Sequence, residues 1–140
     1  MQHYGIIGYP LRFSFSQNYF TKKFLDEGIV DASYSIYPIE TAEGIKNILQ
    51  QNHMLKGLNV TIPHKKNILP FLTNTANLPL GLHACNCIKI DGERLIGYNT
   101  DVIGFEKSLA PFLQPHHTHA LILGTGGAAV AVEWVLQKLN

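Results

Sequence analysis

Short apolar runs, each ending at a proline, a glycine or a turn, recur along the first 100 residues. Runs of about four to eight residues with β-branched and aromatic side chains are typical of buried strands. Two of these runs flank Asp91-Gly92, a strong two-residue turn signal that predicts a hairpin. The predicted strands are residues 4–8, 33–37, 57–62, 85–90 and 94–98.

Segments with apolar residues at helical spacing lie between these strands and after them. Gly28 is the expected stop of the first helix, and Thr41 is the expected N-cap of the second. Pro70 breaks the third helix, and Thr100 or Asp101 is expected to cap the fourth. The predicted helices are residues 17–27, 42–52, 64–73 and 102–110. Strands that alternate with helices in this way predict an α/β fold, and the hairpin makes its small sheet a mixed one.

The pattern changes after residue 110. Residues 111–119 contain two prolines and three histidines and are predicted to be a connector. Residues 120–123 are wholly apolar, which predicts a buried strand of the parallel type. A glycine turn over residues 124–129 and a helix over residues 130–139 follow, so we expect the first βα unit of a second domain.

Composition and charge exclude several classes of protein. The chain has 140 residues, of which 46% are hydrophobic and 15% charged, which suits one packed domain and not a disordered chain. A net charge of +1 with no basic run argues against a nucleic-acid-binding arm or a polybasic membrane patch. No apolar stretch approaches the roughly 20 residues of a membrane span, and the N-terminus lacks the apolar core and cleavage site of a signal peptide. Cys85 and Cys87 fit neither a disulfide framework nor a zinc site, so we expect a cytoplasmic protein.

The glycine turn has the pattern Gly124-x-Gly126-x-x-Ala129 between an apolar strand and a helix. Its glycines allow a tight turn, and the start of the helix offers free N–H groups and a positive dipole to a pyrophosphate. The alternative is a turn that only packs a helix on a strand. The acidic or arginine residue that meets the adenosine ribose comes about 20 residues after such a turn, so we expect the phosphate loop here without the ribose site.

Polar residues gather where the predicted strands end or helices begin, which is where α/β folds build their sites. Each has a plain structural explanation when taken alone: a helix cap for the serines and the aspartate, a solvated lysine, and an asparagine bonded to neighbouring backbone. Together, hydroxyls at a helix start suit a carboxylate, amide and carboxylate groups suit a polyol, and a lysine beside an aspartate can exchange a proton with an alcohol. The candidates are Ser14, Ser16, Thr61, Lys65, Asn86 and Asp101.

Three motifs occur in register with the glycine turn: Gly57-x-Asn59-Val60-Thr61-Ile62-Pro63-x-Lys65, Asn99-Thr100-Asp101-x-x-Gly104-Phe105 and Tyr4-Gly5-x-Ile7-Gly8-x-Pro10. In this combination the chain resembles the shikimate dehydrogenase family over its whole length. The resemblance implies a three-layer, mixed-sheet domain at residues 1–101 that binds shikimate, a linking helix and connector at 102–119, and the start of a truncated Rossmann NADP domain at 120–140. It also implies reversible NADP-dependent reduction of 3-dehydroshikimate to shikimate, a step of aromatic amino-acid biosynthesis.

The resemblance also implies a role for each candidate. Ser14 and Ser16 would bind the substrate carboxylate, and Thr61, Asn86 and Asp101 its hydroxyl groups. Lys65 would be the general acid/base, hydrogen-bonded near Asp101. The cofactor phosphates would meet the glycine turn at Gly124, Gly126, Gly127 and Ala128.

Departures from the family pattern limit this expectation. Gln17 stands where the family usually has proline, and Cys85 and Cys87 replace the Val and Thr of an Ala-Val-Asn-Thr run. By strand alternation both cysteines face away from Asn86, so we expect small buried hydrophobic groups rather than catalytic thiols. The further Rossmann strands, the arginine for the 2′-phosphate and the C-terminal substrate contacts would lie beyond residue 140. We therefore expect this chain by itself not to turn over.

Two alternatives remain open at the level of sequence. Quinate, which has one more hydroxyl at C1, is an alternative ligand for the same scaffold. A module that binds a cyclohexane carboxylate without catalysis is an alternative of a different class. We expect no metal site at His116, His117 and His119, because they lie in a proline-flanked connector.

Overall fold

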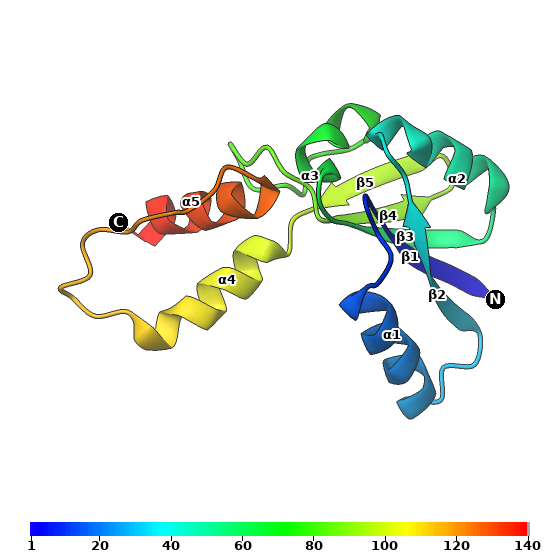
Figure 1. The fold of residues 1–140 in the computed structure, drawn as a ribbon, viewed down its shortest axis with the longest axis horizontal. Helices are drawn as coiled ribbons and strands as arrows, with labels where there is room; N and C mark the ends of the chain where they lie inside the picture. The colour runs from blue at the N-terminus through cyan, green and yellow to red at the C-terminus, as the bar shows by residue number, and fades with distance from the viewer. Residues whose placement is uncertain (140) are drawn as a thin grey trace.

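The computed structural model describes residues 1–139 and contains one five-stranded mixed sheet (Figure 1). The strand order is β2-β1-β3-β4-β5, with β1 parallel to both β2 and β3 and with β4 antiparallel to β3 and β5. The five strands predicted within residues 4–98 and the hairpin are confirmed. Their bounds are Gln2–Gly8 for β1, Ala32–Pro38 for β2, Leu55–Val60 for β3, Cys87–Asp91 for β4 and Arg94–Tyr98 for β5.

Helices cover the sheet unequally. The sheet face that carries Ile7, Leu58 and Ile88 packs against α2 and α3 and forms the main core, in which these three side chains are at most 2% exposed. The opposite face is covered by α1, which lies mainly beside the edge strand β2 and has no fully buried residue (Figure 1). The result is a three-layer α/β unit with one thin layer. The helices are α1 (Phe15–Asp26), α2 (Ile45–Gln51), α3 (His64–Asn67), α4 (Asp101–Leu109) and α5 (Gly127–Leu139), with 3₁₀ turns at Ala42–Gly44, Leu69–Phe71 and Ala110–Phe112.

A second, smaller core joins α4 and α5, which lie side by side away from the sheet (Figure 1). Val102 of α4 packs with Ala131 and Val135 of α5, and Leu82 from the loop before β4 completes the cluster. Lys138 bridges Glu106 at 2.8 Å on the surface of this pair. The second core therefore fixes α5 with respect to the beginning of α4.

The strand expected at residues 120–123 is wrong. This segment is irregular, and Leu121 and Leu123 are 84% and 89% exposed. A parallel strand is stable only when neighbouring strands accept its hydrogen bonds and helices cover both faces. None of the described strands lies beside it, so its apolar side chains remain in solvent and the first βα unit consists of its turn and helix alone.

Two predicted helix caps are also wrong. Thr41 precedes the 3₁₀ turn before α2 without a side-chain bond to the backbone. At α4 the capping oxygen belongs to Asn99, whose Oδ1 accepts from the N–H groups of Asp101 and Val102 at 3.0 and 3.3 Å. Neither Thr100 nor Asp101 caps α4, and the carboxylate of Asp101 is therefore available for other partners.

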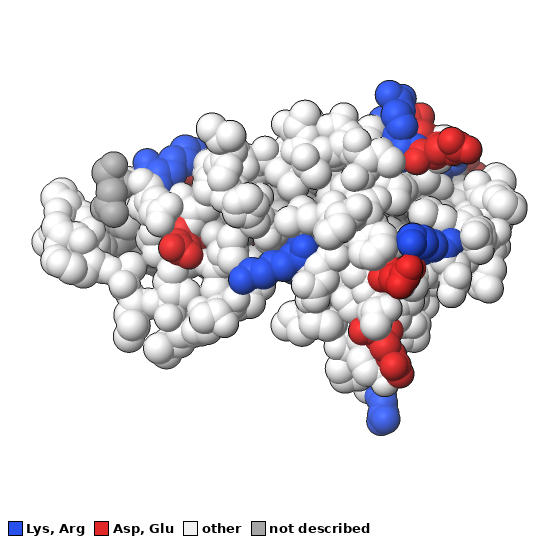
Figure 2. All heavy atoms as spheres, turned by 90° about the horizontal axis from the view of Figure 1, so that it is seen from above, with Lys and Arg blue, Asp and Glu red and all other residues white. Residues whose placement is uncertain are grey.

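Charged residues of both signs are scattered in small groups over the face seen in Figure 2, where no single-sign field dominates. Some form exposed pairs four residues apart along and just after α1, such as Lys22 with Asp26 and Lys23 with Glu27. Among residues 1–139, no helix is both long and apolar enough to span a membrane.

Candidate functional site

Lys65 and Asp101 form the centre of the site. Lys65 lies in α3 directly after β3, and Asp101 is the first residue of α4. The ammonium Nζ of Lys65 donates to Oδ2 of Asp101 at 2.6 Å, and their side chains are only 15% and 29% exposed. The prediction that these two residues meet is confirmed. Partial burial makes this a stronger interaction than the exposed ion pairs elsewhere on the chain.

Asn86 completes a three-residue cluster with them. Its Nδ2 donates to Oδ1 of Asp101 and to Oγ1 of Thr100, both at 2.8 Å, while its Oδ1 accepts from the N–H of Thr100 at 2.8 Å. The two oxygens of Asp101 therefore have different partners, Asn86 on one side and Lys65 on the other. A backbone hydrogen bond also joins the segments of Asn86 and Lys65, because the N–H of Cys85 donates to the carbonyl of Lys65 at 2.8 Å.

The serine pair lies at the start of α1. Ser14 is the N-cap of this helix, with its Oγ accepting from the N–H of Gln17 at 3.3 Å, so the structural explanation for Ser14 is correct. Ser16 lies near the phenol of Tyr34, which donates to Oδ1 of Asn59 at 2.6 Å. This chain of contacts leads from α1 across the sheet to β3.

Asn59 connects the serine end of the site to its lysine end. It pairs with Cys87 in the β3–β4 ladder, and the next residue, Val60, donates its N–H to the carbonyl of Asn86 at 2.8 Å. Asn59 and Tyr34 are absent from the candidates derived from the sequence. Strand alternation gave a usable signal for Asn59, which lies two residues before Thr61 and so points to the same face.

Thr61 follows β3 directly and lies against the end of β1. Its N–H donates to the carbonyl of Ile7 at 2.9 Å, and its carbonyl accepts from the N–H of His64 at 2.9 Å. Its methyl group lies where a side chain on Gly8 would be, only 2.5 Å from an added Cβ. Thr61 is thereby held at the turn that leads into α3, and the glycine at position 8 is required for that close approach.

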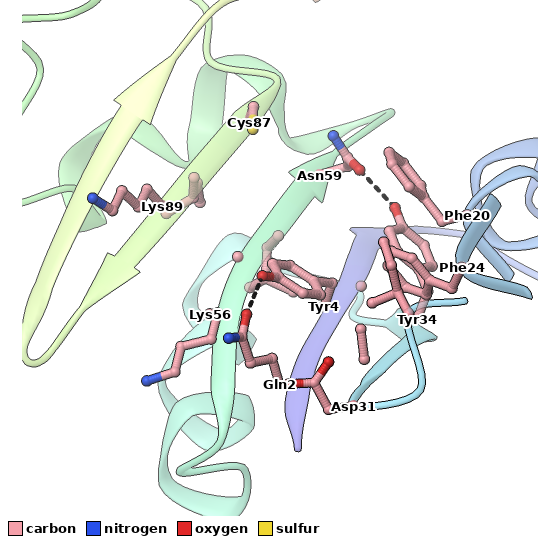
Figure 3. Close-up of a pocket in the computed structure, with 16 residues that line it drawn as sticks. Gln2, Tyr4, Phe20, Phe24, Asp31, Tyr34, Lys56, Asn59, Cys87 and Lys89 are labelled. Carbon is pink, nitrogen blue, oxygen red and sulfur yellow. Dashed lines mark hydrogen bonds between the residues drawn. The ribbon is translucent and has the colours of Figure 1, made fainter. Parts of the chain in front are cut away.

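A groove of about 570 Å³ lies on the thinly covered sheet face, between α1 and the strands β1, β3 and β4 (Figure 3). Tyr4, Phe20, Phe24 and Tyr34 supply its aromatic wall, and Asn59 lies near the C-terminal end of β3. The stacked rings of Phe20 and Tyr34, with centroids 4.9 Å apart, hold α1 against the strand edge. The groove itself is predominantly apolar, so the polar cluster rather than the groove offers the chemistry of a site.

The two cysteines are free thiols in different surroundings. Cys85 is fully buried in the main core and donates to the carbonyl of Cys87 at 3.3 Å, and burial raises the pKa of its thiol to about 11. Cys87 is only partly buried and lines the groove on the opposite sheet face, so the expectation of a buried cysteine is wrong for this residue. Burial raises the pKa of Cys87 as well. A thiol that remains protonated is a poor nucleophile, which agrees with a packing role for Cys85.

Alkaline pH is expected to destabilise the fold through Cys85 and Tyr34. Burial raises the pKa of Cys85 to about 11 and that of Tyr34 to about 12, whereas in the unfolded chain these groups ionise near their ordinary values of 9.0 and 10.0. Above pH 9 the unfolded state therefore binds fewer protons, and the free energy of unfolding falls as pH rises. We expect a loss on the order of 2 kcal/mol between pH 8 and pH 10.5 in urea unfolding.

Cys85→Ala provides the control for this titration. The variant lacks the thiol but keeps Tyr34, so its stability should fall less steeply between the same two pH values. Equal unfolding free energies of the original chain at pH 8 and pH 10.5 would contradict the assignment.

The glycine turn lies close to α3. Gly124 has a φ of +128°, a conformation that favours glycine, and a Cβ added to Gly126 would meet open space. Gly127 begins α5, whose 13 residues give it a full helix dipole. An open approach to a helix start fits a phosphate group, so the residues present are compatible with the pyrophosphate part of NADP.

The histidines of the connector show no arrangement for a metal. The rings of His116 and His117 contact edge to face, with centroids 4.3 Å apart, and Nδ1 of His119 is hydrogen-bonded to Oγ1 of Thr118. Within residues 1–139, no group of three His, Cys, Asp or Glu side chains is placed to hold an ion.

Comparison with known proteins shows the family of the chain. Residues 6–88, which include Lys65 and Asn86, match the model described as the shikimate dehydrogenase substrate binding domain. The chain belongs to this family. The NADP(+) shikimate dehydrogenase of Halothermothrix orenii is 37% identical over 141 residues, which cover 96% of this chain and 47% of that protein. The enzyme of the same name from Staphylococcus haemolyticus is 34% identical, and the match covers 97% of this chain and 51% of that enzyme.

Solved structures of shikimate dehydrogenases have the same fold. The Aquifex aeolicus enzyme aligns with a TM-score of 0.80 at 34% identity, over 99% of this chain and 52% of the other. The Thermus thermophilus enzyme, solved in complex with NADP(H) and shikimate, aligns with a TM-score of 0.81 at 27% identity, over 99% and 53%. The chain thus spans about half the length of the shikimate dehydrogenases that it matches.

Proposed function

We propose that this chain binds shikimate and 3-dehydroshikimate and supplies the acid/base lysine of an NADP-dependent shikimate dehydrogenase. The observation that carries the proposal is the partly buried pair of Lys65 and Asp101, 2.6 Å apart, with Asn86 on the other carboxylate oxygen. Relatives at 34–37% identity that bear this name support it, as does the complex of the Thermus thermophilus enzyme with shikimate and NADP(H).

The cluster suits proton transfer at an alcohol. When the C3 hydroxyl of shikimate is oxidised, its oxygen must lose a proton, and in the reverse direction the new alkoxide must gain one. An amine at Lys65 accepts that proton and an ammonium returns it. Asp101 holds the lysine in position and presents an oxygen to a neighbouring hydroxyl of the ring. NADP, when bound, supplies the acceptor or donor of the hydride.

The remaining candidate residues would bind different groups of the substrate. Ser14 and Ser16, at the start of α1, would hold the ring carboxylate, since hydroxyls at a helix start are suitable donors to an anion. Thr61 and Asn86 would bind ring hydroxyls beside Asp101, and Asn59 lies between the two groups. Cofactor phosphates would meet the turn at Gly124, Gly126, Gly127 and Ala128. We also infer a reducing, cytoplasmic compartment, in which the free thiols Cys85 and Cys87 persist.

Shikimate titrated into the chain by calorimetry tests this proposal. We expect saturable binding that Asp101→Asn weakens by at least about tenfold, because a hydrogen bond to a charged group is lost. Asp91→Asn is the matched control, since Asp91 lies in the β4–β5 hairpin, where its side chain pairs with the nearby Arg94. The affinity of the Asp91→Asn variant for shikimate should equal that of the original chain.

The same titration distinguishes shikimate from quinate as the ligand. Heat with quinate and none with shikimate would reassign the ligand. Heat with neither, in a chain whose fold is intact, would overturn the proposal of a preformed site.

A further inference from the structure

The beginning of α5 is in direct contact with the acid/base lysine. A Cβ built on Gly127 would lie 2.5 Å from Cβ of Lys65, 3.1 Å from its Cδ and 3.2 Å from its Cγ. Separations this short leave no space for any side chain at position 127. The aliphatic stem of Lys65 therefore lies against the bare backbone of Gly127.

A second contact holds the same two segments together. Nζ of Lys66 donates to the carbonyl of Thr125 at 2.8 Å, across 59 positions of sequence. Consecutive lysines of α3 thus contact the glycine turn in different ways, Lys65 through its stem and Lys66 through its charge.

The three glycines of the turn have different physical requirements. Gly124 is needed for its backbone conformation, with a φ of +128°. Gly126 has no heavy atom within 4 Å of an added Cβ, so this position faces open space. Gly127 alone is enclosed, and the group that encloses it is Lys65.

Lys65 is consequently held between the first residues of two helices. Its ammonium bonds Asp101 at the start of α4, and its stem rests on Gly127 at the start of α5. The small core of Val102, Ala131 and Val135 fixes those two helices to each other. A shift of the α4–α5 pair would therefore change both contacts of this lysine.

We propose that Gly127 is a positioning residue for Lys65, which keeps the ammonium on Asp101 and links the glycine turn mechanically to the acid/base group. The functional meaning of this link rests on the proposed dehydrogenase activity, but the contact itself is testable without substrate or cofactor. A side chain at position 127 must displace either the lysine stem or α5, and in both cases the Lys65–Asp101 bond loosens.

The test compares Gly127→Ala with Gly126→Ala, two identical changes in adjacent positions of one turn. The first readout is the acetylation rate of Lys65 relative to the exposed Lys107, measured by mass spectrometry under trace labelling. In Gly127→Ala we expect Lys65 to react about fivefold faster, a factor that matches the loss of a partly buried ion pair. In Gly126→Ala the rate should stay within about twofold of the original, since the added methyl group has open space.

The second readout is the ¹H–¹⁵N correlation signal of the Lys65 ammonium. A hydrogen-bonded, shielded ammonium exchanges slowly enough to be seen, so the signal should be present in the original chain and in Gly126→Ala and absent in Gly127→Ala. Backbone amide spectra show whether each variant is folded. Should Gly127→Ala fail to fold, Lys66→Met serves instead, because it removes the bond to Thr125. We then expect Lys65 to be acetylated faster than in the original chain, but by less than fivefold.

The outcomes separate this inference from the proposed function. The positioning role would be overturned if Lys65 were acetylated at the same rate in Gly127→Ala and in Gly126→Ala. Where Lys66→Met is used instead, equal acetylation rates of Lys65 in this variant and in the original chain would overturn it. Shikimate binding to the original chain would be unaffected by that result. Conversely, a chain that ignores shikimate but shows the expected difference between the glycine variants would retain the positioning role and lose the function.

Discussion

Lys65→Met is expected to reduce turnover of shikimate by about 10²–10⁴-fold while KM changes by no more than about threefold. Methionine keeps the unbranched stem that packs on Gly127 but has no group that can carry a proton. The Asp101 carboxylate keeps its bond to Asn86, so the hydroxyl-binding side of the site persists. Turnover is measured with NADP in a protein that joins this chain to the part of its Halothermothrix orenii relative that the match does not cover.

Lys107→Met is the control for that assay, because Lys107 is an exposed lysine of α4 outside the cluster. Its kinetic constants should match those of the unaltered protein. A Lys65→Met variant with normal turnover and a raised KM would show that the lysine only binds substrate, and the acid/base role would have to be abandoned.

Val135→Asp is expected to release α5 from α4 while the five-stranded sheet stays folded. Val135 is fully buried in the small core, and an unpaired carboxylate at this position destabilises the core by several kcal/mol. This cost exceeds the free energy that the few packed side chains of the small core contribute. The main core shares no residue with this cluster. The readout is fluorescence: Trp134 is the single tryptophan, and its indole donates to the carbonyl of Leu80 at 2.9 Å, so its emission should move to the red on release.

Gln137→Asp introduces the same charge two residues along α5, at an exposed position, and should leave the emission unchanged. Hydrogen exchange then locates the change: protection should be lost in α5 and retained in β1, β3 and β4. If Trp134 emission is the same in Val135→Asp and in the original chain, the small core does not hold α5.

Most of the sheet could be predicted because its signals are local. Pro38 and the Asp91-Gly92 turn fix where strands end through backbone geometry that needs no distant partner, and β2, β4 and β5 end or turn there. The start of β4 was placed two residues early. Cys85 and Asn86 direct their N–H groups to the carbonyls of Lys65 and Tyr98, so these residues join the site rather than the β3–β4 ladder.

The errors share a physical cause, which is competition between partners far apart in sequence. The apolar segment at residues 120–123 has the composition of a strand, but composition does not supply the neighbouring strands that it requires. Asp101 was a reasonable cap by type and position, yet Asn99 takes that role, because its Nδ2 donates to the carbonyl of Ala84 and so holds its Oδ1 toward the start of α4. Asn59 becomes part of the site only because Tyr34 reaches it across β1.

The sequence by itself determined the α/β class, the order of its elements and the set of polar groups from which the cluster is built. Periodicity, turn residues and residue chemistry are properties of the chain that survive without any tertiary contact. Only the tertiary structure decided that Lys65 meets Asp101 at 2.6 Å and that Gly127 lies against the stem of this lysine. Those contacts join segments 36 and about 60 positions apart, and their geometry depends on how the sheet and the α4–α5 pair pack together.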